Sequence, residues 1–123
     1  MARVAHFEIC ADDVERAVSF YQHVFGWEIR KWEGPHDYWI VITGEDSEQP
    51  GINGGILDRR DSFAGSVNLV DVATLDNALL RVVEADGVII HSRSTIAGVG
   101  YVAYCRDSEG NPFGLIERDE LAA

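Results

Sequence analysis

The chain closes on a stretch of turn residues followed by apolar ones, Asp107-Ser108-Glu109-Gly110-Asn111-Pro112-Phe113-Gly114-Leu115-Ile116-Glu117. Its first half favours a turn, because glycine and asparagine tolerate a positive φ and proline fixes its own φ. Its apolar second half predicts a short buried strand over Phe113–Ile116 that runs into Glu117. A carboxylate in that position must be paired, protonated or metal-bound if it stays buried, and is an ordinary surface group if it reaches solvent.

The composition bounds what surrounds this stretch. The chain has 123 residues, of which 46% are hydrophobic, and this fits one globular domain. Its net charge of -11 argues against a nucleic-acid-binding face and weakly favours cationic small molecules. No apolar run approaches the roughly 18 residues of a membrane span, and the N-terminus lacks the apolar stretch of a signal peptide. We therefore expect a cytoplasmic protein that binds neither nucleic acid nor membranes.

Cys10 and Cys105 lie in apolar settings and are expected to be small buried hydrophobes.

Periodicity divides the chain into two similar halves. The first half predicts a strand, a helix and three strands, over 3–10, 14–25, 27–32, 38–43 and 52–57. We expect Asp12 or Asp13 to cap the helix, Gly26 to end it, and Gly54 and Gly55 to mark a close approach of another group.

A polar linker over 58–65 separates the halves, after which the same pattern of elements restarts over 67–72, 75–83, 88–91, 101–105 and 113–116. Adding 61 to a residue number takes Ala17 to Ala78 and Gly26 to Gly87, so helix falls on helix and the terminal glycine on a glycine. The sequence therefore predicts one α+β domain over 1–123, built from two βαβββ modules at about 1–58 and 65–123.

Three motifs carry a family resemblance: His6-Phe7-Glu8-Ile9, the run from Ala17 to Trp27 (AVSFYQHVFGW), and the closing stretch quoted above. With the paired modules they resemble the vicinal oxygen chelate superfamily, which includes glyoxalase I, bleomycin-resistance proteins and extradiol dioxygenases. The resemblance covers nearly the whole chain. It implies a cupped mixed eight-stranded sheet around a small-molecule site, in a protein that pairs as a homodimer.

The resemblance also implies site residues, because the metal enzymes of this superfamily take ligands from the first and last strands of both modules. His6 and Glu117 fall at two such positions, as ligands of a divalent Ni, Zn, Fe or Mn ion, with Glu117 also a candidate catalytic base. Two of the four expected ligands are absent: the shift takes His6 to Val67, and the strand over 52–57 offers no acid or imidazole. Glu8 shares the face of His6 and is a candidate substitute.

Three residues are predicted to contact the ligand, namely Glu8, Trp39 and Tyr101. Three functions stay open at this point. The protein is a lyase or related enzyme with a reduced metal site, or a metal-free protein that sequesters a drug as bleomycin-resistance proteins do. A structural or regulatory dimer that uses its sheet edges is the third. Metal content separates the first two, and mutation of edge strands tests the third.

Overall fold

The computed structural model describes residues 2–35, 37–44, 49–59 and 65–123. The chain divides into two compact units, His6–Val67 and a second that joins Met1–Ala5 to Asn68–Ala123. Most of the predicted linker and most of the predicted loop over 45–49 lie outside the described residues.

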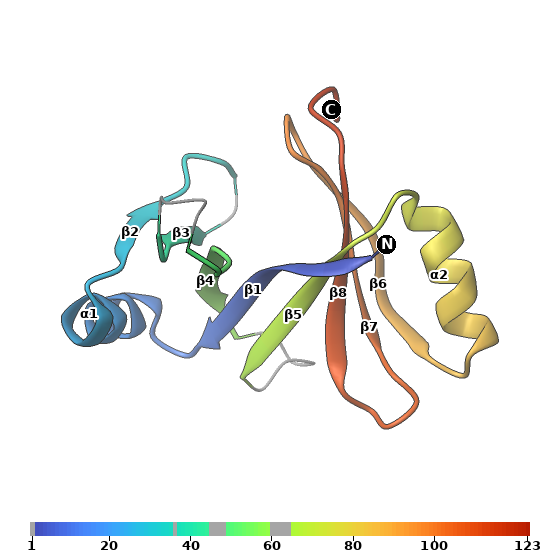
Figure 1. Ribbon diagram of the computed structural model, residues 1–123, viewed down its shortest axis with the longest axis horizontal. Coiled ribbons are helices and arrows are strands. Elements are labelled where there is room, and N and C mark those ends of the chain that lie inside the picture. Colours follow the sequence, from blue (N-terminus) through green and yellow to red (C-terminus); the bar gives the residue numbers. More distant parts are fainter. Residues whose placement is uncertain (1, 36, 45–48, 60–64) are drawn as a thin grey trace. The chain divides into compact units, whose positions relative to one another are not determined.

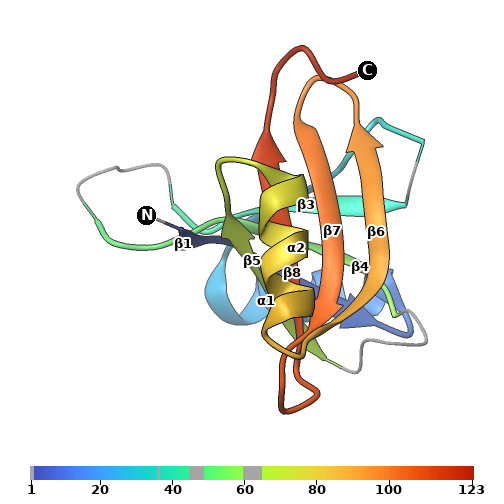
Figure 2. The same ribbon diagram turned by 90° about the vertical axis from the view of Figure 1, so that its right-hand side faces the viewer.

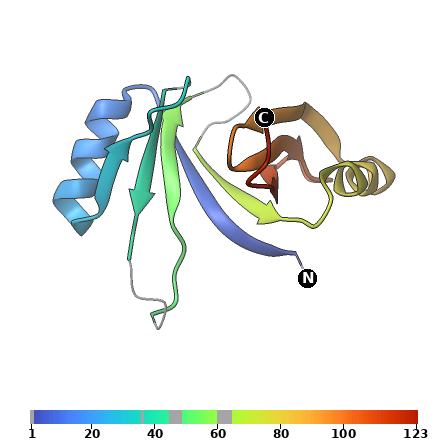
Figure 3. The ribbon, with the colours of Figure 1, turned by 90° about the horizontal axis from the view of Figure 1, so that it is seen from above.

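The first unit holds a helix and a four-stranded mixed sheet, made of β1 (Arg3–Ala11, whose first residues belong to the other unit), α1 (Val14–Phe25), β2 (Glu28–Lys31), β3 (Tyr38–Ile42) and β4 (Gly54–Asp58). The strand order is β2-β3-β4-β1, with β1 parallel to β4 and the other pairs antiparallel. α1 lies alongside this sheet (Figures 1 and 3). The buried cluster between them consists of Ala11, Val14, Val18, Ile29, Val41 and Ile56.

The second unit repeats this plan with β5 (Ser66–Asp71, whose first two residues belong to the other unit), α2 (Leu75–Glu84), β6 (Val88–Ile96), β7 (Gly100–Arg106) and β8 (Pro112–Arg118). Its strand order is β5-β8-β7-β6, again with one parallel pair, β5 and β8. α2 covers one face of these strands (Figure 2) over the buried cluster Leu75, Leu79, Ala103, Cys105 and Leu115. The predicted α+β class with two βαβββ modules is confirmed.

β6 is longer than predicted, because it continues through polar residues to Ile96. Its pairing with β7 shifts register twice, between Ile89 and His91 and between His91 and Ser94. Such irregularities break the alternation of apolar and polar residues on which a sequence-based strand assignment depends.

The two helices begin and end differently. Asp13 is the N-cap of α1, and its side chain accepts a hydrogen bond of 3.1 Å from the Arg16 amide; Gly26 ends the helix at φ 69°. Gly26 was predicted to end the helix, and Asp13 is one of the two predicted cap residues, Asp12 and Asp13. At the end of α2 the prediction was wrong, because the left-handed residue is Asp86, at φ 67°, and not Gly87.

The end of α2 is a Schellman motif, which explains this difference. The Gly87 amide donates to the Val82 carbonyl at 2.8 Å, and the Asp86 amide donates to the Val83 carbonyl at 3.2 Å. Gly87 is needed for space instead, because a Cβ there would meet the Val82 side chain and the Arg106 carbonyl.

The glycines of β4 confirm the predicted close approach. β1 and β4 place Phe7 beside Gly54, and a Cβ on Gly54 would fall against the Phe7 carbonyl and ring. Glycine is therefore required here by a neighbouring backbone, because a carbonyl of a paired strand cannot move aside.

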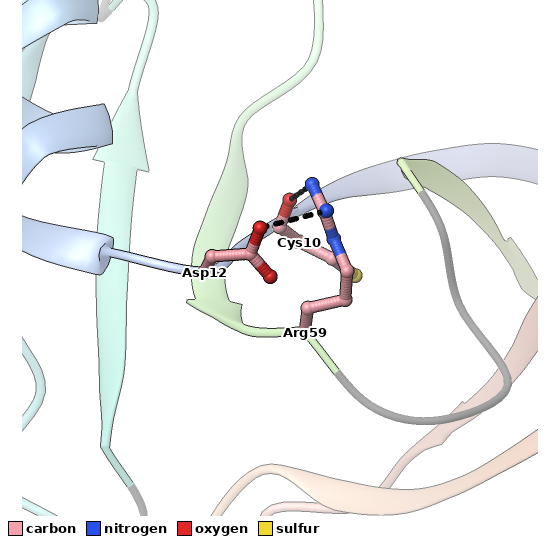
Figure 4. A network of polar contacts seen from close by, with 3 residues as sticks. All are labelled: Cys10, Asp12 and Arg59. Carbon is pink, nitrogen blue, oxygen red and sulfur yellow. Dashed lines mark hydrogen bonds and ion pairs between the residues drawn. The ribbon is translucent and has the colours of Figure 1, made fainter.

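Arg59 fastens the end of β4 to the turn between β1 and α1 (Figure 4). Its guanidinium donates to the Asp12 carboxylate at 3.1 Å and to the Cys10 carbonyl at 3.3 Å, and its amide donates to the Ala11 carbonyl at 2.8 Å. These contacts fix where the first unit's last strand ends.

Both cysteines are free and buried, as predicted. Burial raises the pKa of the Cys105 thiol, so this side chain stays a neutral apolar group in the α2 cluster. Within the described residues, neither helix is long and apolar enough to cross a bilayer.

Candidate functional site

The face of the first unit's sheet that α1 does not cover carries polar side chains from β1. Phe7, Ile9 and Ala11 pack against or belong to the α1 cluster. Side chains alternate along a strand, so His6, Glu8 and Cys10 share the opposite face, as the sequence predicted. We call this opposite face the helix-free face of the first unit.

A histidine–tyrosine pair lies on this face. The Nε2 atom of His6 and the hydroxyl oxygen of Tyr38 are 2.8 Å apart, and the imidazole tautomer decides which of them donates. Both side chains are half-buried. Gly55 makes room for the pair, because a Cβ at that position would fall on the Tyr38 hydroxyl. The missing side chain in β4 therefore positions the tyrosine hydroxyl.

Glu8 lies beside this pair on the same strand. Glu8 is 5% exposed, and among the described residues no other charged side chain is buried. In the pairing of β1 with β4 it stands directly beside Gly55, the residue over which the Tyr38 hydroxyl lies. No buried side-chain nitrogen or oxygen in the described part of the chain lacks a hydrogen-bond partner, so no fully buried oxygen of Glu8 is left unsatisfied.

Tyr38 was not among the predicted site residues. The sequence placed it only at the start of the strand expected over 38–43. One signal pointed to it, because paired glycines in a strand indicate that another group approaches closely. That signal gives the position of the approach and leaves the approaching residue open.

Glu117 belongs to the second unit, where it contacts α2. Its Oε1 atom accepts a hydrogen bond of 2.7 Å from the amide of Leu75, the first residue of that helix. The N-cap residue Thr74 makes no side-chain capping bond. Phe113 and Leu115 pack in the α2 cluster, so alternation along β8 places Glu117 on the helix-covered face as well. Glu117 therefore caps α2 from a distant strand.

The other predicted ligand-contact residues lie toward the helices. Trp39 packs against the α1 cluster, and Tyr101 packs against the α2 cluster with the Arg93 guanidinium 4.2 Å from its ring centre. Val67, which takes the place of His6 in the repeat, is 2% exposed and belongs to the core.

The metal donors can be compared with the contacts they make. No group of three or more His, Cys, Asp or Glu side chains that could hold a metal ion occurs in residues 2–35, 37–44, 49–59 and 65–123. His6 shares its Nε2 atom with Tyr38, and Glu117 uses Oε1 on the Leu75 amide. The metal site at His6 and Glu117 stays a prediction, and we route no chemistry through it.

Comparisons with known proteins agree with this fold. Residues 3–44 match the family model for the bleomycin resistance protein-like N-terminal region. No curated protein matches the sequence.

Solved structures match the whole chain at low identity. A methylmalonyl-CoA epimerase in complex with methylmalonyl-CoA and ammonium matches with a TM-score of 0.72 and 13% identity, over 100% of this chain and 99% of that one. A Streptomyces coelicolor methylmalonyl-CoA epimerase variant in complex with 2-nitronate-propionyl-CoA matches with a TM-score of 0.71 and 14% identity, over 98% and 97%. A hypothetical protein from Bacillus halodurans matches with a TM-score of 0.67 and 14% identity, over 99% and 98%.

These matches, with the matched N-terminal region, support the glyoxalase/bleomycin-resistance superfamily, and the predicted resemblance is confirmed. At such low identity the solved structures speak for the fold alone.

Proposed function

We propose that this protein binds a small carbonyl compound on the helix-free face of the first unit and moves a proton at the carbon next to the carbonyl. Such a reaction belongs to a lyase or isomerase. One observation carries the proposal, which is that the His6–Tyr38 pair and the buried Glu8 share one sheet face around Gly55. The likeness in fold to a methylmalonyl-CoA epimerase adds support for an acyl thioester as the substrate class.

The proposed chemistry uses three side chains. The Glu8 carboxylate takes the proton from the carbon, so a C–H bond breaks, an O–H bond forms on Glu8, and the electron pair moves onto the carbonyl oxygen. The Tyr38 hydroxyl donates to that developing oxyanion, and His6 orients the hydroxyl through the 2.8 Å contact. Return of the proton to carbon restores the carboxylate.

A direct test is deuterium incorporation into methylmalonyl-CoA in D₂O, followed by ¹H NMR against a protein-free blank. We expect Glu8→Gln to abolish the protein-dependent exchange and Tyr38→Phe to lower its rate by about 100-fold, as loss of an oxyanion donor does. Glu28→Gln is the matched control, because Glu28 is an exposed carboxylate on β2 of the same sheet. Exchange that survives Glu8→Gln in a folded protein would remove Glu8 as the base.

A second candidate function is sequestration of a cationic drug, as in bleomycin-resistance proteins. The family match over residues 3–44 and the net charge of -11 favour it. It predicts tight binding of bleomycin by calorimetry, with no proton exchange into any thioester. Micromolar bleomycin binding together with an exchange rate equal to the blank would select this function over the first.

The predicted divalent metal at His6 and Glu117 is tested by the metal content of protein purified without chelators. Near-stoichiometric Ni, Zn, Fe or Mn that is lost in His6→Ala and in Glu117→Ala would support it. Metal that stays in the Glu117→Ala protein would exclude Glu117 as a ligand.

The homodimer and the cytoplasmic location also stay predictions. Light scattering at micromolar concentration should give twice the 13.6 kDa chain mass. A mass equal to one chain would exclude the dimer, and with it the non-catalytic dimer as a function.

A further inference from the structure

A cavity of about 930 Å³ lies in the second unit, between α2 and the strands β5 and β8. Every residue that lines it belongs to that unit, and none of them is a residue of the proposed proton-transfer site. The cavity is therefore separate from that site.

The floor of the cavity is apolar. Val70 and Phe113 come from the strands, Ala78 and Val82 come from α2, and all four are half-buried, while Leu115 below them is buried. Half-buried aliphatic and aromatic side chains around a hollow provide contact area for the hydrocarbon part of a ligand.

The rim of the cavity carries positive charge. Three of the chain's ten basic residues line it, Arg3, Arg81 and Arg106, although the protein as a whole has a net charge of -11. Such a concentration of guanidinium groups in an acidic protein is a local reversal of sign, and it attracts anions to this cavity.

The two carboxylates of the lining are already engaged. Asp71 accepts from the Arg118 guanidinium at 3.2 Å. Asp107 accepts from the amides of Glu109 and Asn111, both at 2.9 Å. These carboxylates are therefore not aimed at the rim arginines.

The arginines differ in what they already bind. Arg106 donates through Nη1 to the Gly110 carbonyl at 2.8 Å, so it is anchored to the turn. Among the described residues, Arg3 and Arg81 enter no ion pair, and both are exposed. Their guanidinium groups keep a planar set of donors for a carboxylate or phosphate.

We propose that this cavity binds an organic anion with an apolar body, an alkyl carboxylate or alkyl phosphate. The head group lies between Arg3 and Arg81, and the alkyl chain lies over Phe113, Val70 and Val82. The site is independent of the proposed proton transfer, since it uses no side chain of the helix-free face.

The experiment is a calorimetric titration with octanoate and with octyl phosphate. Octanamide tests the apolar body without the charge, and inorganic phosphate tests the charge without the body. We expect saturable binding of at least one of the two anionic amphiphiles and binding at least tenfold weaker for octanamide and for inorganic phosphate. Octanamide binding as tightly as octanoate and octyl phosphate would overturn the proposal. The stronger of the two anions identifies the head group.

Three variants locate the binding. Arg3→Gln and Arg81→Gln should each weaken it about tenfold, the effect of losing one hydrogen bond to a charged group. Arg16→Gln is the matched control, because Arg16 is an exposed arginine on the equivalent helix of the first unit. Ala78→Leu narrows the apolar part of the cavity and leaves every charge in place, so it should also weaken binding.

Two outcomes would contradict the proposal. Unchanged affinity in the Arg3→Gln/Arg81→Gln double variant would place the anion elsewhere. Binding that follows a change from monomer to dimer in light scattering, and fails at concentrations where the chain is monomeric, would assign the cavity to a second copy of the chain. Thermal unfolding of each variant verifies that the fold is intact, and none of these outcomes depends on methylmalonyl-CoA exchange.

Discussion

The first and second units share one topology and differ in what their sheets carry on the helix-free face. Gly55 and Gly114 are equivalent, because each stands beside the residue that the shift of 61 relates, Glu8 in β1 and Leu69 in β5. Each glycine has a tyrosine of the next strand close to it, Tyr38 and Tyr104. The two tyrosines are not equivalent, because Tyr104 pairs directly with Gly114, whereas Gly55 pairs with Ile40. Only the glycine is common to both repeats.

The residues of β1 and β5 on the same face as these glycines differ between the two repeats. His6 and Glu8 of the first unit correspond to Val67 and Leu69, which are each 2% exposed. The second repeat thus has core residues in β5 where the first has a histidine and a buried carboxylate in β1. Duplication repeats what the fold needs, and the proposed chemistry rests on what only one copy keeps.

The core aromatic ring also changes strand between the units. In the first, Phe7 of β1 lies against Gly54 of β4; in the second, Phe113 of β8 packs in the α2 cluster, and Asn68 takes the place of Phe7 in β5. One ring fills the same layer from either strand, because packing depends on the volume supplied and not on its strand of origin.

The largest expected effect comes from testing this packing with Gly54→Ala. The new Cβ meets the Phe7 carbonyl, which belongs to the paired strand, so the free energy of unfolding should fall by about 2–4 kcal/mol. Urea denaturation measures it. Gly51→Ala is the control, since a Cβ there meets no atom within 4 Å, and it should change stability by less than about 1 kcal/mol. Equal effects would mean that the ring does not depend on this glycine.

Helix capping gives the next largest contrast. α1 is capped by Asp13 from three residues away, and α2 by Glu117 from 42 residues away. Asp13→Ala and Glu117→Ala should each cost about 1–2 kcal/mol, because each leaves a helix amide without its acceptor. Urea denaturation with and without a chelator measures the cost, which should be the same in both. A loss seen only without the chelator would mean that Glu117 stabilises by holding a metal.

How much of this molecule the sequence predicts depends on the range of each interaction. Strands, helices, the Asp13 cap and the shared face of His6 and Glu8 all follow from spacings of two to four residues. The hydrogen bond from the Leu75 amide to Glu117 joins residues 42 positions apart, and the contact of His6 with Tyr38 joins residues 32 positions apart. No local sequence pattern predicts contacts over such separations. The prediction for Gly87 was wrong because glycine at the end of a helix usually takes the left-handed conformation. Here Gly87 instead makes room for the Val82 side chain and the Arg106 carbonyl.

Glycine substitutions at the two helix ends should change the free energy of unfolding in opposite directions. Asp86→Gly should raise the free energy of unfolding by about 0.5–1 kcal/mol, because φ 67° is unfavourable for a residue with a Cβ. Gly26→Ala, at φ 69°, should lower it by about 1 kcal/mol. Thermal unfolding measures both. Destabilisation by Asp86→Gly would show that the aspartate side chain is worth more than the relief of the backbone.

The smallest expected effect concerns pH and the turns between the last two strands of each unit. In the first unit the connection between β3 and β4 is held by hydrogen bonds of Thr43, from its amide to the Asn53 side chain and from its hydroxyl to the Ile52 carbonyl, and both side chains are neutral. In the second, the Asn111 amide bound to Asp107 is the main cause that holds the pKa of this carboxyl below its ordinary 3.8. The lowered pKa contributes stability that is complete above 3.8 and is lost as pH falls through the folded-state value.

An NMR titration of the Asp107 carboxyl checks this, and its midpoint should lie below 3.8. Amides of the β7–β8 turn should shift with the same midpoint, and those of Thr43 and Asn53 should not. A midpoint at or above 3.8 would mean that the turn hydrogen bonds do not favour the charged form.

The cap of α2 has a consequence for the order in which the protein is made. On the ribosome, α1 receives its capping carboxylate before the helix itself is synthesised, because Asp13 precedes it. α2 receives its capping carboxylate from Glu117, which lies 42 residues beyond Leu75 and follows β6 and β7 in the chain. Domains form from the N-terminus as the chain emerges. The cap of the first helix is therefore available before that helix is made, and the cap of the second helix becomes available only after β6 and β7 have been synthesised.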